Sequence, residues 1–336
     1  MNRIFAGAIV TILVILFVGC SHSSEKTIGL LVHTTKSSRW NTDIQFINER
    51  AQVLGMKVVL CDANEDENLQ LQQAKEVLKQ GVDVLIVIAA NQNTAAGIVR
   101  EAHLYHVPVI GYDRVIRNSD LDYMVSFHYF EVGRLLVEYV AEKSPNGNCV
   151  ILYGDANDGN ALVVKKGIEE TIQNLPLEQK LNVEYVSYVE NWNYNNSNHI
   201  MNNVLDFNQN KVDAVIACND PLGIGAYDAL TAHGYKPNEV IITGQDATAD
   251  FVRSMLEGGL TMSVYKPIKD LANGAVDMAY SLANNKKIEG LNGKVNNGRK
   301  EVPAILFSPS VVDQNNYKEK LIDSGLVKNI LAKTAK

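Results

Sequence analysis

Two short apolar segments of the sequence each lead to an aspartate in the same pattern. Residues 107–110 are followed by a glycine, one further residue, Asp113 and Arg114, and residues 240–243 are followed by a glycine, one further residue and Asp246. Short apolar segments rich in β-branched residues are typical of buried parallel strands, and open parallel sheets bind ligands at the carboxyl ends of their strands. A carboxylate or guanidinium group at such an end can bind two neighbouring hydroxyl groups at once. The repeated pattern predicts two related half-sites that face one cleft.

Other side chains that follow predicted strands extend this set. Most of them are planar hydrogen-bonding groups, and the two tryptophans of the chain are also among them. A flat apolar ring beside forked polar groups suits a sugar, whose C–H faces are apolar and whose edge carries hydroxyls. Their occurrence together predicts a sugar site at the strand ends, where the following residues are found: Arg39, Trp40, Asn91, residues 157–160, Trp192, Asn219, Asp220, Gln245 and Lys266.

Several of these residues also have a purely structural interpretation. Asp113 and the arginine after it could close a turn as a surface ion pair. Asn219 and Asp220 precede a proline, which is typical of a helix N-cap and first turn. Lys266 also precedes a proline and could be an extended hinge residue, whereas Trp192 could pack on its own lobe. It is their occurrence together at strand ends that favours a binding site.

Motifs of common catalytic sites are absent from the sequence. It has no Gly-x-Ser-x-Gly turn, no His-Glu-x-x-His motif, no Gly-x-x-x-x-Gly-Lys phosphate loop and no dinucleotide fingerprint after the first predicted strand. No nucleophile has an identifiable base, and no cofactor or metal is expected. We therefore predict a binding protein and not an enzyme.

Length and composition indicate a globular protein of two domains. The chain has 336 residues, of which 46% are apolar and 21% are charged. Its net charge of −7, without a cluster of lysines and arginines, argues against nucleic acid as a partner.

Apolar periodicity predicts alternating strands and helices in two successive groups. The first group has strands at residues 27–32, 57–61, 84–88, 109–112 and 123–127, with a loop at 34–40, and a break follows at 144–148. The second group has strands at 149–153, 183–189, 214–217 and 240–243, and both groups contain a Val-Asp pair before a strand, at 82–83 and 212–213. Further strands are expected at 261–264 and 305–307, a helix at 268–283, a surface loop at 284–300 and a tail helix at 315–331. This order predicts two doubly wound α/β lobes with parallel sheets.

The N-terminal segment has the features of an export signal. A basic start is followed by an apolar run over residues 4–18 and then by Cys20. Residues 18–21 resemble a bacterial lipobox, which predicts that Cys20 is lipidated, and an uncleaved membrane anchor is the alternative. Either way the folded part is expected outside the cytoplasmic membrane and tethered to it. The other cysteines, Cys61, Cys149 and Cys218, are odd in number and are expected to be buried apolar residues.

The motifs together resemble those of the periplasmic sugar-binding proteins of the ribose/galactose type. The similarity covers nearly the whole chain after the export segment and is most specific at residues 38–40, 81–85, 111–114, 218–220, 244–247, 264–267 and 302–306. The Tyr-Asp-Arg sequence at 112–114 and the Val-Tyr-Lys-Pro sequence at 264–267 favour the xylose branch of this family over the ribose branch.

This resemblance implies a fold, a site and a mode of action. The type I periplasmic binding fold has three hinge crossings, here expected near Phe127, Val264 and Pro303. Residues 26–127 with 265–303 would form the N-terminal lobe, residues 128–264 with 304–336 the C-terminal lobe, and residues 1–25 the export segment. The lobes would close around a monosaccharide. Trp40 and Trp192 would stack on the sugar, and hydrogen bonds would come from Arg39, Asp113, Arg114, Asn160, Asn219, Asp246 and Lys266.

One segment departs from the family pattern, and it bears on the partner. Residues 126–129 read Ser-Phe-His-Tyr where relatives carry an Asp-Asn pair, so no ligand contact is expected there, and the hinge or a partner surface is expected to differ. The resemblance implies a membrane partner that recognises the closed form. It is either the permease of an ABC importer or, as for some tethered relatives, a sensor histidine kinase. A transcriptional repressor of the same fold would need a helix-turn-helix where this chain has its export segment.

Overall fold

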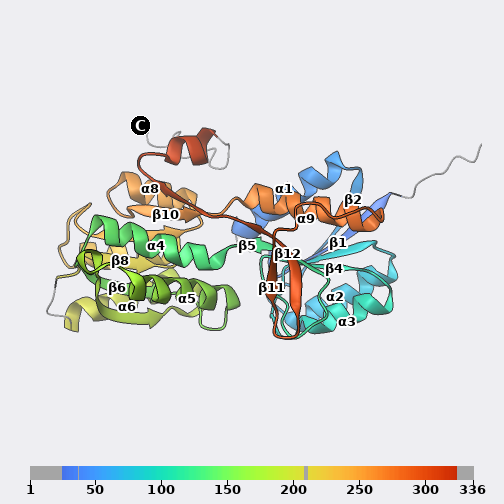
Figure 1. Cartoon of the computed structure of the whole chain (residues 1–336), viewed down its shortest axis with the longest axis horizontal. Helices are drawn as coiled ribbons and strands as arrows, with labels where there is room; N and C mark the ends of the chain where they lie inside the picture. Colours follow the sequence, from blue (N-terminus) through green and yellow to red (C-terminus); the bar gives the residue numbers. More distant parts are fainter. Residues whose placement is uncertain (1–24, 37, 208–210, 324–336) are drawn as a thin grey trace, which may run out of the picture.

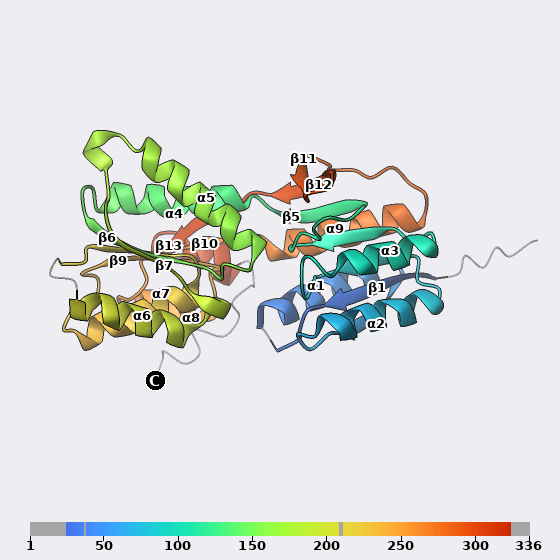
Figure 2. The same cartoon turned by 90° about the horizontal axis from the view of Figure 1, so that it is seen from below.

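The computed structural model describes residues 25–36, 38–207 and 211–323, and these form two α/β lobes that lie side by side along the longest axis of the molecule (Figure 1). One lobe is built on a seven-stranded sheet and the other on a six-stranded sheet. Helices cover both faces of each sheet (Figure 2). The prediction of two doubly wound lobes is therefore confirmed. Cys20 and the other residues of the expected export segment up to residue 24 lie outside the described residues.

The N-terminal lobe has the strand order β11-β12-β5-β4-β3-β1-β2. Neighbouring strands are parallel except for β11 and β12, which form an antiparallel hairpin. Helices α1 and α9 lie on one face of the sheet, and α2 and α3 lie on the other (Figure 1). The elements are β1 (Lys26–Val32), α1 (Ser38–Val53), β2 (Met56–Asp62), α2 (Glu67–Lys79), β3 (Val84–Val87), α3 (Ala96–Leu104), β4 (Val109–Tyr112), β5 (Tyr123–Phe127), α9 (Ile268–Ala283), β11 (Gly293–Asn296) and β12 (Glu301–Phe307).

The C-terminal lobe has the strand order β13-β10-β9-β8-β6-β7, with only β13 antiparallel to its neighbour among the described strands. Helices α4 and α5 cover one face, and α6, α7 and α8 cover the other (Figure 2). The elements are α4 (Tyr129–Lys143), β6 (Asn148–Tyr153), α5 (Gly159–Asn174), β7 (Asn182–Tyr188), α6 (Tyr194–Phe207), β8 (Ala214–Ala217), α7 (Asp220–Ala232), β9 (Ile241–Gln245), α8 (Ala249–Leu256), β10 (Met262–Tyr265) and β13 (Ser310–Asp313), with short helical turns at Leu177–Gln179, Glu190–Trp192 and Lys318–Asp323.

The Val-Asp pairs of the sequence occupy equivalent places in the two lobes. Asp83 lies before β3, and its Oδ2 accepts a hydrogen bond of 2.8 Å from the backbone N–H of Thr27 in β1. Asp213 lies before β8, and its Oδ2 accepts one of 3.0 Å from the N–H of Asn148 in β6. Each aspartate thus satisfies a backbone donor at the start of the central strand beside it. The predicted internal repeat is a real structural repeat.

Close packing of α4 on α5 fixes the two helix starts that face the cleft. A Cβ atom on Gly133 of α4 would lie 2.1 Å from the carbonyl oxygen of Val164, and one on Gly167 of α5 would lie 2.2 Å from that of Phe130. Only glycine permits this approach of the two backbones. Because the helices lie in contact, Tyr129 and Asn160 at their N-terminal ends come from neighbouring elements.

The chain crosses between the lobes after β5, after β10 and after β12 within the described residues. The third crossing was expected near Pro303, and that expectation is wrong. Strand β12 pairs with β5 as far as Phe307 opposite Phe127, so residues 304–307 belong to the N-terminal sheet and the chain crosses at 308–309. Pairing with a strand far away in the sequence decides this boundary, and apolar character alone does not reveal it.

Four further local expectations need correction. The expected loop at 284–300 contains strand β11, and helix α8 was not expected at all. Helix α1 begins at Ser38, so Arg39 lies in its first turn and not in a loop. Of the expected tail helix, residues 318–323 form a short π-helical turn, and residues 324–336 lie outside the described part.

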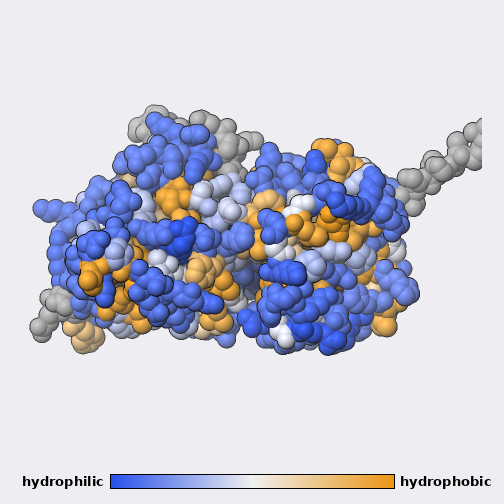
Figure 3. Space-filling view, in the orientation of Figure 1, coloured by the Kyte–Doolittle hydropathy of each residue, from blue (hydrophilic) through white to orange (hydrophobic). Residues whose placement is uncertain are grey.

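The cysteines and the surface agree with a folded globular chain. Cys149 and Cys218 are buried and free, whereas Cys61 is half-buried and free. On the face seen in Figure 3, hydrophilic side chains predominate, and the apolar side chains form separate patches on the two lobes.

Candidate functional site

All the side chains predicted to bind the sugar surround one cavity of about 190 Å³ between the lobes, hereafter the inner cavity. Arg39 and Trp40 reach it from the start of α1, and Asp113 and Arg114 reach it from the end of β4. The C-terminal lobe contributes residues after β6, β7, β8, β9 and β10. The complete lining is Arg39, Trp40, Asp113, Arg114, Tyr129, Asp158, Asn160, Val164, Trp192, Asn219, Gln245, Asp246 and Lys266.

Asp113 is held by donors from both lobes. It has a left-handed backbone with φ of 62°, and its N–H donates to the carbonyl of Val125 at 2.8 Å. Its carboxylate accepts hydrogen bonds from Arg39 Nη2 at 2.8 Å, from Asn160 Nδ2 at 3.2 Å and from the hydroxyl of Tyr129. Burial by itself would raise the pKa of Asp113, but Arg39 and Lys266 outweigh burial and hold the pKa below its ordinary value. Asp113 is therefore an ionised, buried anchor and not part of a surface ion pair.

Arg39 is fixed by a second carboxylate that the sequence analysis did not single out. Its Nε donates to Asp43 Oδ2 at 2.7 Å, and its Nη2 reaches Asp43 Oδ1 at 3.3 Å. Asp43 also accepts a hydrogen bond from the hydroxyl of Tyr112. Burial by itself would lower the pKa of Arg39, but Asp43 and Asp113 raise it well above its ordinary value. The spacing of four residues between Arg39 and Asp43 on a helix was the available signal for this pair.

The second half-site is built around Asp246 and Lys266. Asp246 has φ of 96°, and its N–H donates to the carbonyl of Val264 at 3.0 Å. Lys266 is 3% exposed, and its Nζ lies 3.0 Å from Asp246 Oδ1 and 5.0 Å from the ring centre of Tyr129. The lysine is thus a buried cation at the cavity wall, compensated by a carboxylate and an aromatic face.

The Asn219-Asp220 pair has mainly a structural role. Asn219 caps helix α7 because its Oδ1 accepts the N–H of Leu222 at 2.9 Å, which leaves its amide nitrogen for the inner cavity. Asp220 is fully buried and accepts from Ser263 Oγ at 2.6 Å and from the N–H of Thr248 at 2.7 Å. Burial raises the pKa of Asp220 to about 7. Asp220 therefore supports the loop that carries Asp246.

The two tryptophans enter the inner cavity from different lobes. Trp40 is 8% exposed and lies under the guanidinium groups of Arg39 and Arg114, at 5.0 and 5.6 Å from the ring centre. Trp192 has φ of 52° and packs on Gly154, where a Cβ atom would lie 2.1 Å from its ring. The backbone of the Glu190–Trp192 turn and the missing side chain of Gly154 thus place this indole in the cleft.

Four lining residues were not predicted to bind the ligand, namely Tyr129, Asp158, Val164 and Gln245. Tyr129 belongs to the departing segment, and its hydroxyl reaches Asp113 from the opposite lobe. Gln245 was noted at a strand end only, and its buried Oε1 has no hydrogen-bond partner among the described residues. Asp158 caps α5 by accepting the N–H of Asn160 at 2.9 Å. The departing segment thus reaches the inner cavity, because Tyr129 lines it.

Known proteins resemble this chain in both sequence and architecture. The model of the family described as "Periplasmic binding protein domain" matches residues 28–287. The chain belongs to this family. The D-xylose-binding periplasmic proteins of Haemophilus influenzae and Escherichia coli are 36% and 35% identical to it, over 92% of this chain and 92% and 93% of their own lengths. A solute-binding protein of Clostridium phytofermentans, solved with bound β-D-glucose, has a TM-score of 0.82 at 29% identity and covers 90% of this chain and 99% of its own.

Membership in the periplasmic binding protein family determines the broad class of the protein. The relatives are sugar-binding proteins and not enzymes, so this chain is an extracytoplasmic sugar-binding member of the family. Within the described residues, no helix combines the length and apolar character needed to cross a membrane. The same part of the chain contains no cluster of three or more His, Cys, Asp or Glu side chains that could hold a metal ion.

Proposed function

We propose that the chain binds D-xylose in the inner cavity. The observation that carries this proposal is the meeting of two tryptophans and ten hydrogen-bonding side chains from both lobes around one small volume. A cavity of about 190 Å³ is smaller than the 300–1,000 Å³ typical of larger ligands and suits a single sugar ring. The two xylose-binding relatives support the choice of sugar.

The charges around the inner cavity favour a neutral sugar over a sugar acid. The sequence alone suggests three cations against two carboxylates at this site. In the structure, Asp43 pairs with Arg39 at 2.7 Å and Asp158 also lines the cavity, so the three cations already face four carboxylates. A carboxylate on the ligand would then bring uncompensated negative charge into a buried site, which costs free energy.

Closure of the lobes is the proposed mechanism of capture. Asp113 belongs to the N-terminal lobe and Asp246 to the C-terminal lobe, so a sugar that contacts both favours the closed arrangement. A micromolar dissociation constant corresponds to about −8 kcal/mol. Spread over about ten heavy atoms of a pentose, this is roughly 0.8 kcal/mol per atom, below the limit for efficient small ligands.

We further propose that the protein is tethered through lipidated Cys20 and presents xylose to the permease of an ABC importer. A second candidate is a xylose-sensing subunit that signals to a sensor histidine kinase, which the long apolar run at residues 4–18 favours. Neighbouring genes distinguish the two. A permease and an ATPase support import, whereas a kinase and a response regulator support sensing.

Calorimetric titration of the full-length protein in detergent tests the proposed sugar. We expect one-to-one binding of D-xylose, with weaker binding of ribose, arabinose, glucose and galacturonate. Trp40→Ala is expected to weaken xylose binding because it removes one stacking face. A folded protein that releases no heat with any of these sugars would contradict the proposal.

A further inference from the structure

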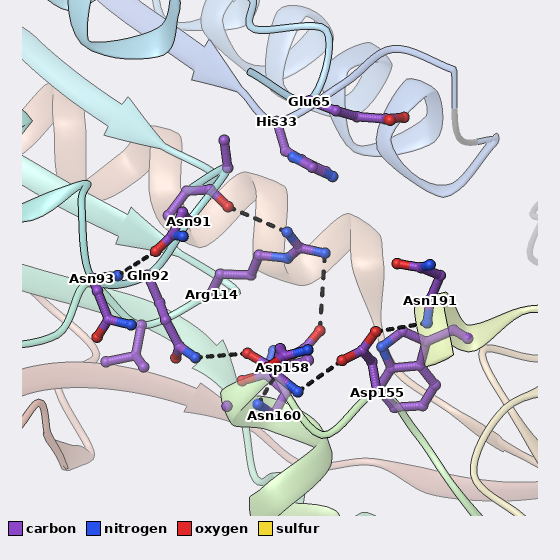
Figure 4. A pocket seen from close by; sticks show the side chains of 16 residues that line it. His33, Glu65, Asn91, Gln92, Asn93, Arg114, Asp155, Asp158, Asn160 and Asn191 are labelled. Carbon is purple, nitrogen blue, oxygen red and sulfur yellow. Dashed lines mark hydrogen bonds and ion pairs between the residues drawn. The ribbon is translucent and has the colours of Figure 1, made fainter. Parts of the chain in front are cut away.

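A second cavity of about 730 Å³ adjoins the inner cavity and is hereafter the outer chamber. The two share four lining residues, Arg114, Asp158, Asn160 and Trp192, and are therefore adjacent. Figure 4 shows His33 and Glu65 on one side of the outer chamber and Asp155 and Asn191 on the other. Its remaining lining residues are Ala89, Ala90, Asn91, Gln92, Asn93, Val115, Asn157 and Gly159.

The lobes already touch on two sides of the outer chamber. On the deep side, Asn160 reaches across to Asp113 at 3.2 Å. At the rim, Gln92 Nε2 donates to the carbonyl oxygen of Asn157 at 2.9 Å. A Cβ atom on Gly159 would lie only 2.5 Å from Gln92 Oε1, so the backbone of the C-terminal lobe already rests against this side chain. The outer chamber therefore remains open although the lobes are in contact, and its volume is larger than one sugar ring requires.

The lining of the outer chamber is polar and has three carboxylates against one guanidinium group, which suits a hydroxylated group without negative charge. Amide side chains reach it from both lobes, including Asn91 and Asn191. Nδ1 of His33 is buried without a hydrogen-bond partner among the described residues. Burial, reinforced by Arg114, lowers the pKa of His33 to about 4, so at neutral pH its ring offers one donor and one acceptor. Trp192 lines both cavities, which extends an apolar stacking face from one to the other.

We infer that the outer chamber is a second sugar subsite and that the protein also binds a disaccharide of linked xylose units. One ring would occupy the inner cavity, and the second would lie along Trp192 toward His33 and Asn191. The inference rests on the proposed function, because the inner cavity must first accept a xylose ring. The size of the outer chamber lies within the range of cavities that hold ligands larger than one ring.

Titration of the full-length protein in detergent with D-xylose and with β-1,4-xylobiose tests this inference. We expect both sugars to bind one-to-one. His33→Ala and Ala90→Phe change only the outer chamber, the first by removing ring nitrogens and the second by adding volume. Each is expected to weaken the binding of xylobiose about tenfold, which is the effect of one lost hydrogen bond or of comparable crowding. The affinity for xylose should stay within about twofold of that of the unmodified protein. Gln72→Ala on the exposed surface of α2 is the matched control and should change neither affinity.

The outcomes separate the two proposals. Xylose binding without xylobiose binding, or xylobiose binding that both outer-chamber variants leave unchanged, would overturn the second subsite and leave the proposed function intact. Absence of heat with both sugars, in a protein shown to be folded by circular dichroism, would overturn the proposed function as well. If Ala90→Phe does not fold, His33→Ala decides the result, because it removes a side chain and adds no volume.

Discussion

Asp113 and Asp246 lie in the same sequence pattern, yet they differ in burial and in their hydrogen-bond partners. Both follow a glycine and one further residue, both have positive φ, and both donate their N–H to the carbonyl of the adjacent strand. Asp113 is 2% exposed and is bonded by Arg39, Asn160 and Tyr129. The side chain of Asp246 is 22% exposed, and its Oδ1 lies 3.0 Å from Lys266 without a hydrogen bond of good geometry.

This difference indicates that the two half-sites have different roles. The protein itself supplies most of the partners of Asp113, so that aspartate orders the cleft before a ligand arrives. Asp246 keeps acceptor capacity that a sugar hydroxyl can use. The backbone motif fixes where each carboxylate lies, and the neighbouring side chains determine whether it serves the fold or the ligand.

Removal of Asp113 is expected to cause the largest loss of stability. Asp113→Ala leaves Arg39 with one carboxylate fewer in a buried site, and the free energy of unfolding should fall by about 3–5 kcal/mol. Urea denaturation measures this change. Asp120→Ala is the matched control, because Asp120 pairs with Arg299 on the surface, where solvent screens the ion pair, and its loss should cost much less. Equal effects of the two variants would contradict the anchoring role of Asp113.

Removal of Asp246 is expected to act mainly on the ligand. Asp246→Ala should weaken xylose binding about 100-fold, the effect of about 3 kcal/mol of charge-assisted hydrogen bonding, and should destabilise the fold less than Asp113→Ala does. Calorimetry and urea denaturation on the same samples test both parts. A stability loss as large as that of Asp113→Ala would remove the distinction between the half-sites.

Loss of the Tyr129 hydroxyl tests the bond that links Asp113 to the other lobe. Tyr129→Phe keeps the ring beside Lys266 but removes one donor to the carboxylate, and we expect a loss of about 1–3 kcal/mol in the free energy of unfolding. Tyr139→Phe is the control, because the Tyr139 hydroxyl bonds Asp313 at 3.3 Å away from the cleft and should matter less. No change in stability for Tyr129→Phe would show that the other donors suffice for Asp113.

The smallest expected effect concerns Asp220, which supports the Asp246 loop. Its pKa is about 7 when folded against an ordinary value of 3.8, so the folded protein favours the protonated form. Its contribution is full below the ordinary pKa and is lost as the pH rises through 7. Asp220→Asn should therefore change stability by less than about 1 kcal/mol at pH 4 and flatten the decline between pH 4 and 7. Denaturation curves at several pH values across this range measure the decline. If the stability of the variant falls with pH as steeply as that of the unmodified protein, the assignment is contradicted.

Local sequence patterns determined the architecture and the composition of the inner cavity. Short apolar strands that alternate with helices specify a doubly wound lobe, and parallel strands bring their carboxyl ends to one edge. For this reason Asp113, Asn219 and Asp246 could be placed together from the sequence. The Val-Asp pairs could also be recognised as a repeat from the sequence, because each aspartate bonds the backbone of the neighbouring strand at the same place in its lobe.

Only the tertiary structure decided how these side chains are partnered. The pairing of β12 with β5, the bond from Tyr129 to Asp113 and the outer chamber all join segments of different lobes or distant parts of the chain. Strand ends and helix faces follow from the two- and 3.6-residue periods of the backbone, which the sequence displays directly. A contact between lobes depends instead on how two completed surfaces meet, and no local period of residues encodes that arrangement.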